Sequence, residues 1–250
     1  MKLYAFILGI IQGLTEFLPV SSSGHLVLAE SILKIDTERL LLIVAMHVGS
    51  LLAICLAAIK DFELTKKLSR GKFFNLVSPI LVGTIPIAII GFLFRLKLEK
   101  IVNYPQITGL FLIITGVILF LTKYAKRTGK TLGLFNAFII GIGQAFAIFP
   151  GISRSGTTIS TGMYLGLDKT LATEFSFLLA IPAIIGASII KLRGSLTSPF
   201  DSTALIIGSI TSFLVSYFAI RVLLSIVRRV GIHIFAYYCF VIGILTIVIL

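Results

Sequence analysis

The stretch Phe149-Pro150-Gly151-Ile152-Ser153-Arg154-Ser155-Gly156-Thr157-Thr158 places a charged residue between two apolar regions that are long enough to enter a lipid bilayer. A charged side chain at bilayer depth costs about 2.5–3.5 kcal/mol on insertion scales, so Arg154 is expected to have a function. Proline and glycine interrupt the helix here, and an interrupted backbone is tolerated at that depth only inside protein or beside a water-filled cavity. The stretch therefore predicts an anion site within a membrane protein.

A second copy of this pattern lies 132 positions earlier in the chain. Seven of the 16 residues from Gly9 to Gly24 are identical, without a gap, to those at 141–156. They are Gly9, Ile10, Gln12, Phe17, Ser21, Ser23 and Gly24. Apolar residues match easily by chance, whereas Gln, Ser and Gly in one register do not. We therefore predict a single membrane domain, residues 1–250, with internal repeats at about 1–124 and 131–250.

The composition is that of a multi-pass membrane protein. Hydrophobic residues make up 57% of the chain and charged residues only 13%, which excludes a soluble globular domain of this size. The net charge of +12 is attributed to cytoplasmic loops that face anionic lipid, so no nucleic-acid partner is expected. Cys55 and Cys239 lie singly in apolar segments and predict neither a disulfide nor a metal site.

Six segments are long enough to cross roughly 30 Å of hydrocarbon. They cover approximately residues 40–59, 74–95, 106–122, 172–191, 203–222 and 232–250. Two further apolar regions, about 3–33 and 132–166, are interrupted by the Ser-rich loops. Each of these is either one broken crossing or a re-entrant helix-loop-helix hairpin that enters and leaves on the same face.

The loop charges favour the re-entrant alternative by a small margin. Lys and Arg divide 13 to 8 between the two faces if both regions are re-entrant, and 12 to 9 if both cross. The positive-inside rule then places both termini outside the cytoplasm. Each half has three spanning helices, so the repeats have inverted topology and their hairpin tips can meet near the midplane. The predicted fold is all-α, with six transmembrane helices and two re-entrant hairpins.

The first loop carries candidate catalytic groups. Gln12 and Glu16 are four residues apart and share one helix face. Glu16 is a candidate metal ligand or general base, or alternatively a structural carboxylate paired with a buried Arg or hydroxyl. In Ser21-Ser22-Ser23-Gly24-His25, a serine is a candidate nucleophile with His25 as its base, and the alternative is a helix N-cap cluster.

The second loop carries the anion-binding candidate. Arg154 can donate two parallel hydrogen bonds to a phosphate, and alternatively it forms a structural ion pair with Glu16. The neighbouring hydroxyls of Ser153, Ser155 and Thr158 are further donors. Outside the loops, His47 is interpreted as a packing histidine, and Glu174 as a carboxylate in the first turn of its helix.

Residues 12–25 (QGLTEFLPVSSSGH) and 150–158 (PGISRSGTT) together resemble the undecaprenyl-diphosphate phosphatase family, the bacitracin-resistance proteins of bacteria. The resemblance extends over the whole chain, including residues 175–182. It implies a multi-pass hydrolase of the bacterial cell (inner) membrane that removes the terminal phosphate of undecaprenyl diphosphate, recycling the lipid carrier for peptidoglycan synthesis. It also implies a site open to the outer face and a requirement for Mg²⁺ or Ca²⁺.

The resemblance implies a role for each site residue as well. Glu16 would serve the metal or the proton transfer, Ser22 would be the nucleophile, His25 its base or orienter, and Arg154 would hold the diphosphate. The substrate-binding residues would be Gln12, Ser21, Ser23, Ser153, Ser155 and Thr158. Many members carry Glu where this chain has Gln12, which removes a charge from the expected metal site. A polyprenyl-phosphate flippase with the same anion site is the alternative function, and a homodimer is compatible with the sequence.

Overall fold

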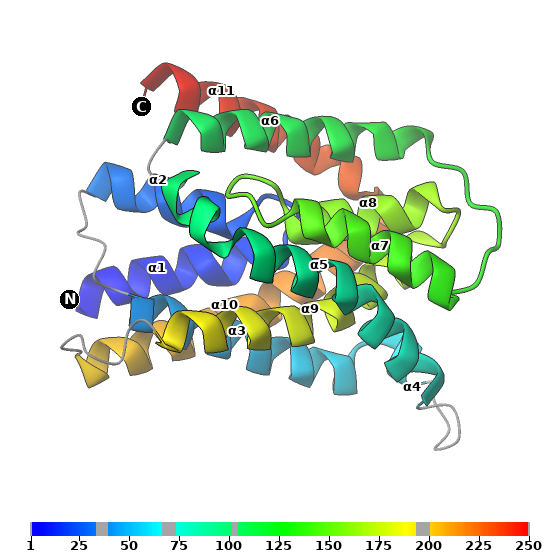
Figure 1. Cartoon of the computed structure of the whole chain (residues 1–250), viewed down its shortest axis with the longest axis horizontal. Helices are drawn as coiled ribbons and strands as arrows, with labels where there is room; N and C mark the ends of the chain where they lie inside the picture. Colours follow the sequence, from blue (N-terminus) through cyan, green and yellow to red (C-terminus); the bar gives the residue numbers. More distant parts are fainter. Residues whose placement is uncertain (1, 34–39, 67–73, 102–104, 194–200, 250) are drawn as a thin grey trace.

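The computed structural model describes residues 2–33, 40–66, 74–101, 105–193 and 201–249, and within these ranges its regular structure is entirely helical (Figure 1). The α-helices are α1 (Lys2–Thr15), α2 (Ser22–Leu33), α3 (Leu40–Lys60), α4 (Glu63–Lys66), α5 (Phe74–Ile101), α6 (Pro105–Leu121), α7 (Leu134–Phe146), α8 (Arg154–Tyr164), α9 (Lys169–Arg193), α10 (Ser202–Arg229) and α11 (Phe235–Ile249). Short 3₁₀ turns, η2 (Thr122–Tyr124) and η3 (Ile232–Ile234), extend α6 and precede α11.

Six of these helices are long and apolar enough to cross a membrane, which confirms the six predicted spans. They are α3, α5, α6, α9, α10 and α11, with their 3₁₀ extensions where present. The helices that flank the Ser-rich loops are shorter, with 14, 12, 13 and 11 residues in α1, α2, α7 and α8. At about 1.5 Å of rise per residue, none of these four reaches across a bilayer by itself.

The four short helices form two hairpins whose loops meet in the middle of the molecule. In Figure 1, α1 and α2 lie side by side in the left half, α7 and α8 lie in the right half, and both connecting loops are central. We call residues 16–21 loop 1 and residues 147–153 loop 2. Gly151 N donates to Ser21 Oγ (3.1 Å), and Ser155 Oγ donates to the Leu18 carbonyl (3.0 Å). These hydrogen bonds hold the loops together.

Loop 1 is anchored in the largest apolar cluster of the protein. Phe17 is fully buried, and its ring meets that of Phe177 on α9 edge to face, with 5.4 Å between ring centroids. Phe62, beside α4, stacks on the other side of Phe177. This aromatic group fixes the backbone of loop 1 immediately after Glu16.

Elsewhere the long helices approach one another through small residues, as is usual inside membranes. At the crossing of α3 with α10, a Cβ on Gly49 would overlap the carbonyl oxygen of Ser209. Beside it, Ser50 and Ser212 share a hydrogen bond of 2.9 Å between their hydroxyls, and Ser212 also donates to the Met46 carbonyl. These contacts satisfy polar groups where no water is available.

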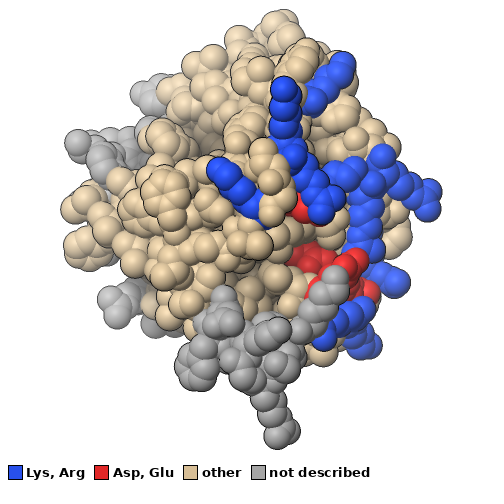
Figure 2. All heavy atoms as spheres, turned by 90° about the vertical axis from the view of Figure 1, so that its right-hand side faces the viewer, with Lys and Arg blue, Asp and Glu red and all other residues tan. Residues whose placement is uncertain are grey.

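The two ends of the helix bundle differ. Both termini lie at one end in Figure 1, whereas Figure 2 shows lysines and arginines gathered at the other end. The basic residues carried by the elements of that end are Lys60, Lys66, Lys123, Lys126, Arg127, Lys130, Lys169, Arg221, Arg228 and Arg229. Cys55 and Cys239 are free thiols, as expected.

The predicted position of Glu174 is wrong in one respect. Helix α9 begins at Lys169, so Glu174 lies beyond its first turn. Its carboxylate instead accepts hydrogen bonds from the backbone N–H groups of Glu63 (3.1 Å) and Leu64 (2.8 Å). Glu174 therefore caps the start of α4, a different helix, and fastens it to α9.

Candidate active site

The centre of the site is a buried ion pair between the two loops. Arg154 Nη2 lies 2.7 Å from Glu16 Oε1, and the side chains are only 17% and 5% exposed. Glu16 follows the last turn of α1, and Arg154 is the first residue of α8. The pair therefore joins residues 138 positions apart at the point where the two hairpins meet. The predicted alternative of an Arg154–Glu16 ion pair is confirmed.

The second oxygen of Glu16 receives two further hydrogen bonds. Ser22 Oγ donates to Glu16 Oε2 at 2.6 Å, and Gln12 Nε2 donates to the same oxygen at 2.8 Å. Ser22 is half-buried at the start of α2, whereas Gln12 is completely buried on α1, one turn before Glu16. A serine hydroxyl that donates to a fixed carboxylate has a proton acceptor in place, which is the arrangement that activates a nucleophile.

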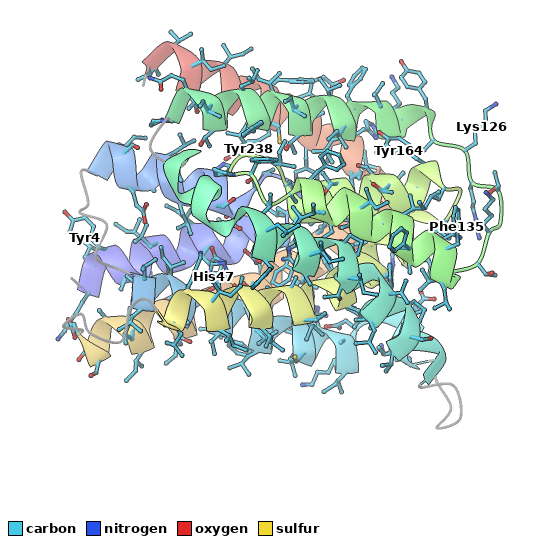
Figure 3. The ribbon with its side chains drawn as sticks, in the orientation of Figure 1. Tyr4, His47, Lys126, Phe135, Tyr164 and Tyr238 are labelled. Carbon is cyan, nitrogen blue, oxygen red and sulfur yellow. The ribbon has the colours of Figure 1, made fainter. Side chains whose placement is uncertain are left out.

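His25 does not face Ser22 in this arrangement. Its Nδ1 lies 2.9 Å from the Ser21 carbonyl, and its Nε2 lies 2.8 Å from the hydroxyl of Tyr238 on α11. The two rings also stack, with 5.6 Å between centroids. In Figure 3, Tyr4 lies near one end of the molecule and Lys126 near the other, and Tyr238 and His47 lie between them. His25 therefore connects the start of α2 to α11.

The carbonyl that His25 holds belongs to a strained residue. Ser21 has a φ of 69°, a left-handed conformation that residues other than glycine rarely adopt. Its hydroxyl accepts hydrogen bonds from Gly24 N (3.3 Å) and Gly151 N (3.1 Å), so both loops support this turn. Strain of this kind persists only where the surroundings enforce it, and it is frequent at functional sites.

Loop 2 ends in a capped helix. Helix α8 starts at Arg154, because Ser153 is its N-cap and accepts a hydrogen bond from Gly156 N (3.0 Å). Thr158 lies one turn into the helix, where its hydroxyl donates to the Arg154 carbonyl (2.8 Å). Both residues thus fix the position of Arg154 through its backbone.

Two side chains beside Glu16, Arg154 and Gln12, each have one polar atom that makes no hydrogen bond to the described residues. Arg154 Nη1 and Gln12 Oε1 are buried, and neither has a hydrogen-bond partner among the described residues. Leaving such a group unpaired costs about 1–3 kcal/mol, so each is expected to bind something else. A donor on Arg154 suits an anion, and an oxygen on Gln12 suits a cation or a hydrogen-bond donor.

A cavity of about 280 Å³ is lined by both members of the ion pair, Glu16 and Arg154. Its polar lining is made of Thr15, Glu16, Ser21, Ser22, Ser23, His47, Ser153, Arg154 and Lys191. An apolar groove of about 430 Å³ between α5 and α7 lies next to it, and Ile148 lines both. Most of the site residues predicted from the sequence therefore line the cavity. Four of them lie outside its described lining and support it from behind: Gln12, His25, Ser155 and Thr158.

Comparison with known proteins agrees with this geometry. Residues 5–245 match the family described as "Bacitracin resistance protein BacA". The chain belongs to this family. Proteins named "Undecaprenyl-diphosphatase" from Halothermothrix orenii and Korarchaeum cryptofilum are 40% and 42% identical to it, over 96% of this chain and 95% and 96% of theirs. A protein of the same name from Christiangramia forsetii is 42% identical over 98% of this chain and 96% of its own.

In this BacA-family protein the donor set for a metal is small. The described residues contain no cluster of three or more His, Cys, Asp or Glu side chains that could bind one. Glu16 is the acidic side chain that lines the cavity, whereas the unpaired Gln12 Oε1 is buried outside the described lining. One carboxylate fits a Mg²⁺ ion, because Mg²⁺ usually takes one or two protein ligands and fills its shell with water and phosphate oxygens.

Two cavity residues of this BacA-family protein differ from the sequence-based picture. His47, interpreted as a packing histidine, lines the cavity and interacts electrostatically with Glu16. Lys191, counted only among the loop charges, lines it as well. The position of His47 inside an apolar span was a sequence signal that could have marked it as a site residue. Lys191 carried no such signal, because basic residues near helix ends are common.

Proposed function

We propose that this membrane protein hydrolyses undecaprenyl diphosphate to undecaprenyl phosphate and inorganic phosphate, and so recycles the lipid carrier for peptidoglycan synthesis. The observation that carries the proposal is the hydrogen bond from Ser22 to Glu16 beside a buried arginine, in a cavity next to an apolar groove. The names of the relatives point to the same reaction. Removal of this diphosphate is also the chemistry expected to confer resistance to bacitracin.

Ser22 is the nucleophile in the proposed mechanism, and Glu16 is its base. Glu16 Oε2 accepts the Ser22 hydroxyl proton across the 2.6 Å hydrogen bond as Ser22 Oγ bonds to the terminal phosphorus. The bond from that phosphorus to the bridging oxygen breaks, and Glu16 passes its proton to that oxygen as undecaprenyl phosphate leaves. Water then attacks the phosphoserine with the deprotonated Glu16 as its base. The bond between phosphorus and Ser22 Oγ breaks, Ser22 Oγ takes the proton back from Glu16, and inorganic phosphate is released.

Positive charge stabilises the transferring phosphoryl group, which is the main catalytic need of this reaction class. Arg154 Nη1 is the buried donor available for a phosphate oxygen. Helices α2 and α8 both begin at the cavity, and the N–H groups of a first turn lack intrahelical partners and favour an anion. Two helix starts and one arginine therefore converge on the place where negative charge develops.

A divalent cation, Mg²⁺ or Ca²⁺, belongs to the same proposal. Glu16 would hold it together with phosphate oxygens of the substrate, and it would supply charge neutralisation. The Glu16 carboxylate is restrained by Ser22, Gln12 and Arg154. These three neighbours keep its oxygens oriented whether or not the ion is bound.

His25 and Tyr238 have a positioning role in this mechanism. Their hydrogen bond and ring stack hold the Ser21 carbonyl, and thereby the start of the helix that carries Ser22. Proton transfer from Ser22 does not pass through the imidazole, because both ring nitrogens have other partners. The proposal thus assigns His25 the orienting role rather than that of the base.

The apolar groove is the proposed binding site of the isoprenoid tail. It is lined by α5, α7 and the start of loop 2 through Ile85, Pro86, Ile89, Ile90, Phe138, Ile142, Ala145, Phe146, Ile148 and Phe149. Because Ile148 also lines the polar cavity, a lipid in the groove would deliver its diphosphate to Ser22. Burial of apolar surface, at about 25 cal/mol per Å², would then favour long-chain substrates.

We further propose that the two hairpins are re-entrant and that the basic end of the molecule is cytoplasmic. Short hairpins in opposite halves, with loops that touch, support one hairpin entering from each side of the membrane (Figure 1). The gathered lysines and arginines support the cytoplasmic assignment (Figure 2). Both termini would then lie outside. Lys191, near the end of α9 on the side of the termini, indicates that the cavity opens outward.

An inverted repeat within one membrane domain completes the proposal. The shift of 132 residues relates Ser22 to Arg154, and these are the first residues of α2 and α8. It also relates the hydrogen bond from Gly24 N to Ser21 Oγ to that from Gly156 N to Ser153 Oγ. Repeats 1–124 and 131–250 would thus place a nucleophile and an anion-binding arginine at equivalent points.

A flippase is not favoured, because a carrier has no use for the Ser22–Glu16 hydrogen bond.

Phosphate release by the purified full-length protein tests the proposal. The wild type in detergent is expected to release phosphate from undecaprenyl diphosphate with Mg²⁺ or Ca²⁺ and to stop in EDTA. Ser22→Ala and Arg154→Lys are each expected to lose more than about 100-fold in kcat/KM, because one removes the attacking oxygen and the other the planar, bidentate donor. Ser31→Ala, an exposed position on α2, is the matched control.

Two outcomes would contradict the proposal. A folded wild type without phosphate release would remove the hydrolase assignment. Retained activity in Ser22→Ala would remove the covalent step, whereas a phosphate trapped on Ser22, found by mass spectrometry after rapid quenching, would support it.

A further inference from the structure

Lys191 lines the polar cavity but not the apolar groove. It is on α9, near the end of that helix, and it lines the same cavity as Ser22 and Arg154. Its ammonium group interacts electrostatically with Glu16 at the ion pair and with Glu30 on α2. A flexible four-carbon stem carries this charge, so Lys191 can move toward a ligand in the cavity.

His47 on α3 also lines this cavity. Its Nδ1 lies 2.7 Å from the Ile43 carbonyl, and because a carbonyl only accepts, Nδ1 carries the hydrogen. That leaves Nε2 as the ring nitrogen for the cavity, which His47 lines. His47 also interacts electrostatically with Lys191 and Arg154. Lys191 and His47 are thus the nitrogen-bearing side chains on the α3–α9 side.

The charge of the substrate requires more than Arg154. The Glu16 carboxylate, 2.7 Å away, compensates the single charge of that guanidinium. A diphosphate headgroup is a polyanion, and buried charges are stable only when paired. Lys191 carries a further positive charge among the residues that line the cavity.

The direction of the groove decides which phosphate Lys191 meets. A tail between α5 and α7 leaves the cavity on the side of Ile148. The phosphate attached to the tail then lies near Ile148, and the terminal phosphate lies farther into the cavity. Helices α3 and α9 line the cavity but not the groove. The wall with Lys191 and His47 is therefore next to the group that is transferred and released.

We propose that Lys191, with His47 beside it, is a substrate-binding residue that contacts the terminal phosphate of the diphosphate and the inorganic phosphate formed from it. This inference rests on the proposed hydrolase function and adds a second positively charged contact to that of Arg154 in the same cavity. The contact is made in the bound substrate as well as in the transition state, so its loss raises KM more than it lowers kcat.

Three variants of the full-length protein test this contact. Lys191→Met keeps the length of the side chain without its charge, and Lys191→Arg keeps the charge. Lys169→Met is the matched control, because Lys169 is at the opposite end of the same helix. Steady-state kinetics with undecaprenyl diphosphate give KM, kcat and the inhibition constant for inorganic phosphate. The melting temperature with and without inorganic pyrophosphate measures binding without turnover.

Lys191→Met is expected to raise KM and the inhibition constant for inorganic phosphate at least about tenfold, because a charge-assisted contact is lost. Its kcat should stay within about threefold of the wild-type value. It should also lose the stabilisation by pyrophosphate, while Lys191→Arg restores most of both and Lys169→Met behaves as wild type. A KM within about twofold of wild type together with an unchanged pyrophosphate effect would overturn the proposal. So would a loss confined to kcat.

Two further outcomes keep the proposal separate from the hydrolase assignment. If Lys191→Met does not fold, Lys191→Gln is measured in the same way. If the wild type is stabilised by pyrophosphate but releases no phosphate, the hydrolase function fails, and the pyrophosphate effect in Lys191→Met still decides whether Lys191 binds the anion.

Discussion

At the scale of single residues, three side chains share the two oxygens of one carboxylate. Arg154 takes Oε1 of Glu16, and Ser22 and Gln12 take Oε2. A buried ion pair is a weak source of stability, since desolvation offsets much of the attraction. Its persistence in a membrane protein is better explained by function, because it holds the proton acceptor for Ser22 and leaves Arg154 Nη1 free for an anion.

His25 provides the prediction at this scale. We expect His25→Gln to lose less than about 100-fold in kcat, whereas loss of a general base costs about 10²- to 10⁴-fold. Tyr238→Phe keeps the ring stack and removes only one hydrogen bond, so it should lower kcat in the same direction by a few-fold, in line with about 1 kcal/mol. The measurement is kcat in detergent, with melting temperature as the folding control. A loss above about 1,000-fold in folded His25→Gln, with Tyr238→Phe unaffected, would identify His25 as the base.

At the scale of helices, close contact between backbones holds the frame around the site. The crossing of α3 and α10 is an example, because Gly49 faces the Ser209 carbonyl without room for a methyl group. Helices α7 and α5 cross in the same way, with Gly141 against the Gly83 carbonyl. Such crossings depend on small residues, since apolar side chains gain little from leaving lipid for protein.

The element-scale prediction follows from this crossing. Gly49→Ala forces α3 and α10 apart, and overpacking costs about 1–3 kcal/mol, which corresponds to a fall of about 2–12 °C in apparent melting temperature. Gly186→Ala on α9 is the control, because its new Cβ meets no atom within 4 Å. It should leave the melting temperature unchanged or raise it slightly, since alanine favours a helix. Equal melting temperatures for the two variants would contradict the tight crossing.

At the scale of the whole molecule, the termini and the basic surface lie at opposite ends (Figures 1 and 2). Six helices are long and apolar enough to cross a membrane, and an even number of crossings agrees with two termini at one end. Lys191, which lines the cavity, is near the end of α9 on the side of the termini, and Lys126 lies at the other end of the molecule (Figure 3). Orientation in the membrane thus decides from which side the substrate headgroup enters.

Cysteine labelling in intact cells tests this orientation. In a background with Cys55→Ala and Cys239→Ala, we expect Lys2→Cys to react with a membrane-impermeant maleimide before permeabilisation. Lys126→Cys should react only afterwards, because a basic end faces the cytoplasm. Both positions are exposed, so access depends on the side of the membrane rather than on burial. The reverse order of labelling would place the cavity on the cytoplasmic side.

The sequence by itself determined the helical spans and the interrupted hairpins, because these depend on local properties. Apolar length defines a span, and Pro and Gly beside Ser define a break, as at Phe149–Thr158 and at its copy around Ser21. The same local pattern selected Glu16, Arg154 and the serines 21–23, since charged and hydroxyl side chains are conspicuous in an apolar context, whereas the choice of Ser22 came from the family resemblance. Helix starts do not follow from apolar length alone: α9 begins at Lys169, so Glu174 is not in its first turn.

Only the tertiary structure decided which of these groups meet. Ser22 donates to Glu16, while His25, only three residues from Ser22, binds Tyr238, which is 213 positions away. His47 and Lys191 reach the cavity because α3 and α9 pack beside the loops, a contact that no local pattern contains. The physical reason is that hydrophobicity and helix period act along the chain, whereas the orientation of one helix against another is set by close packing across it.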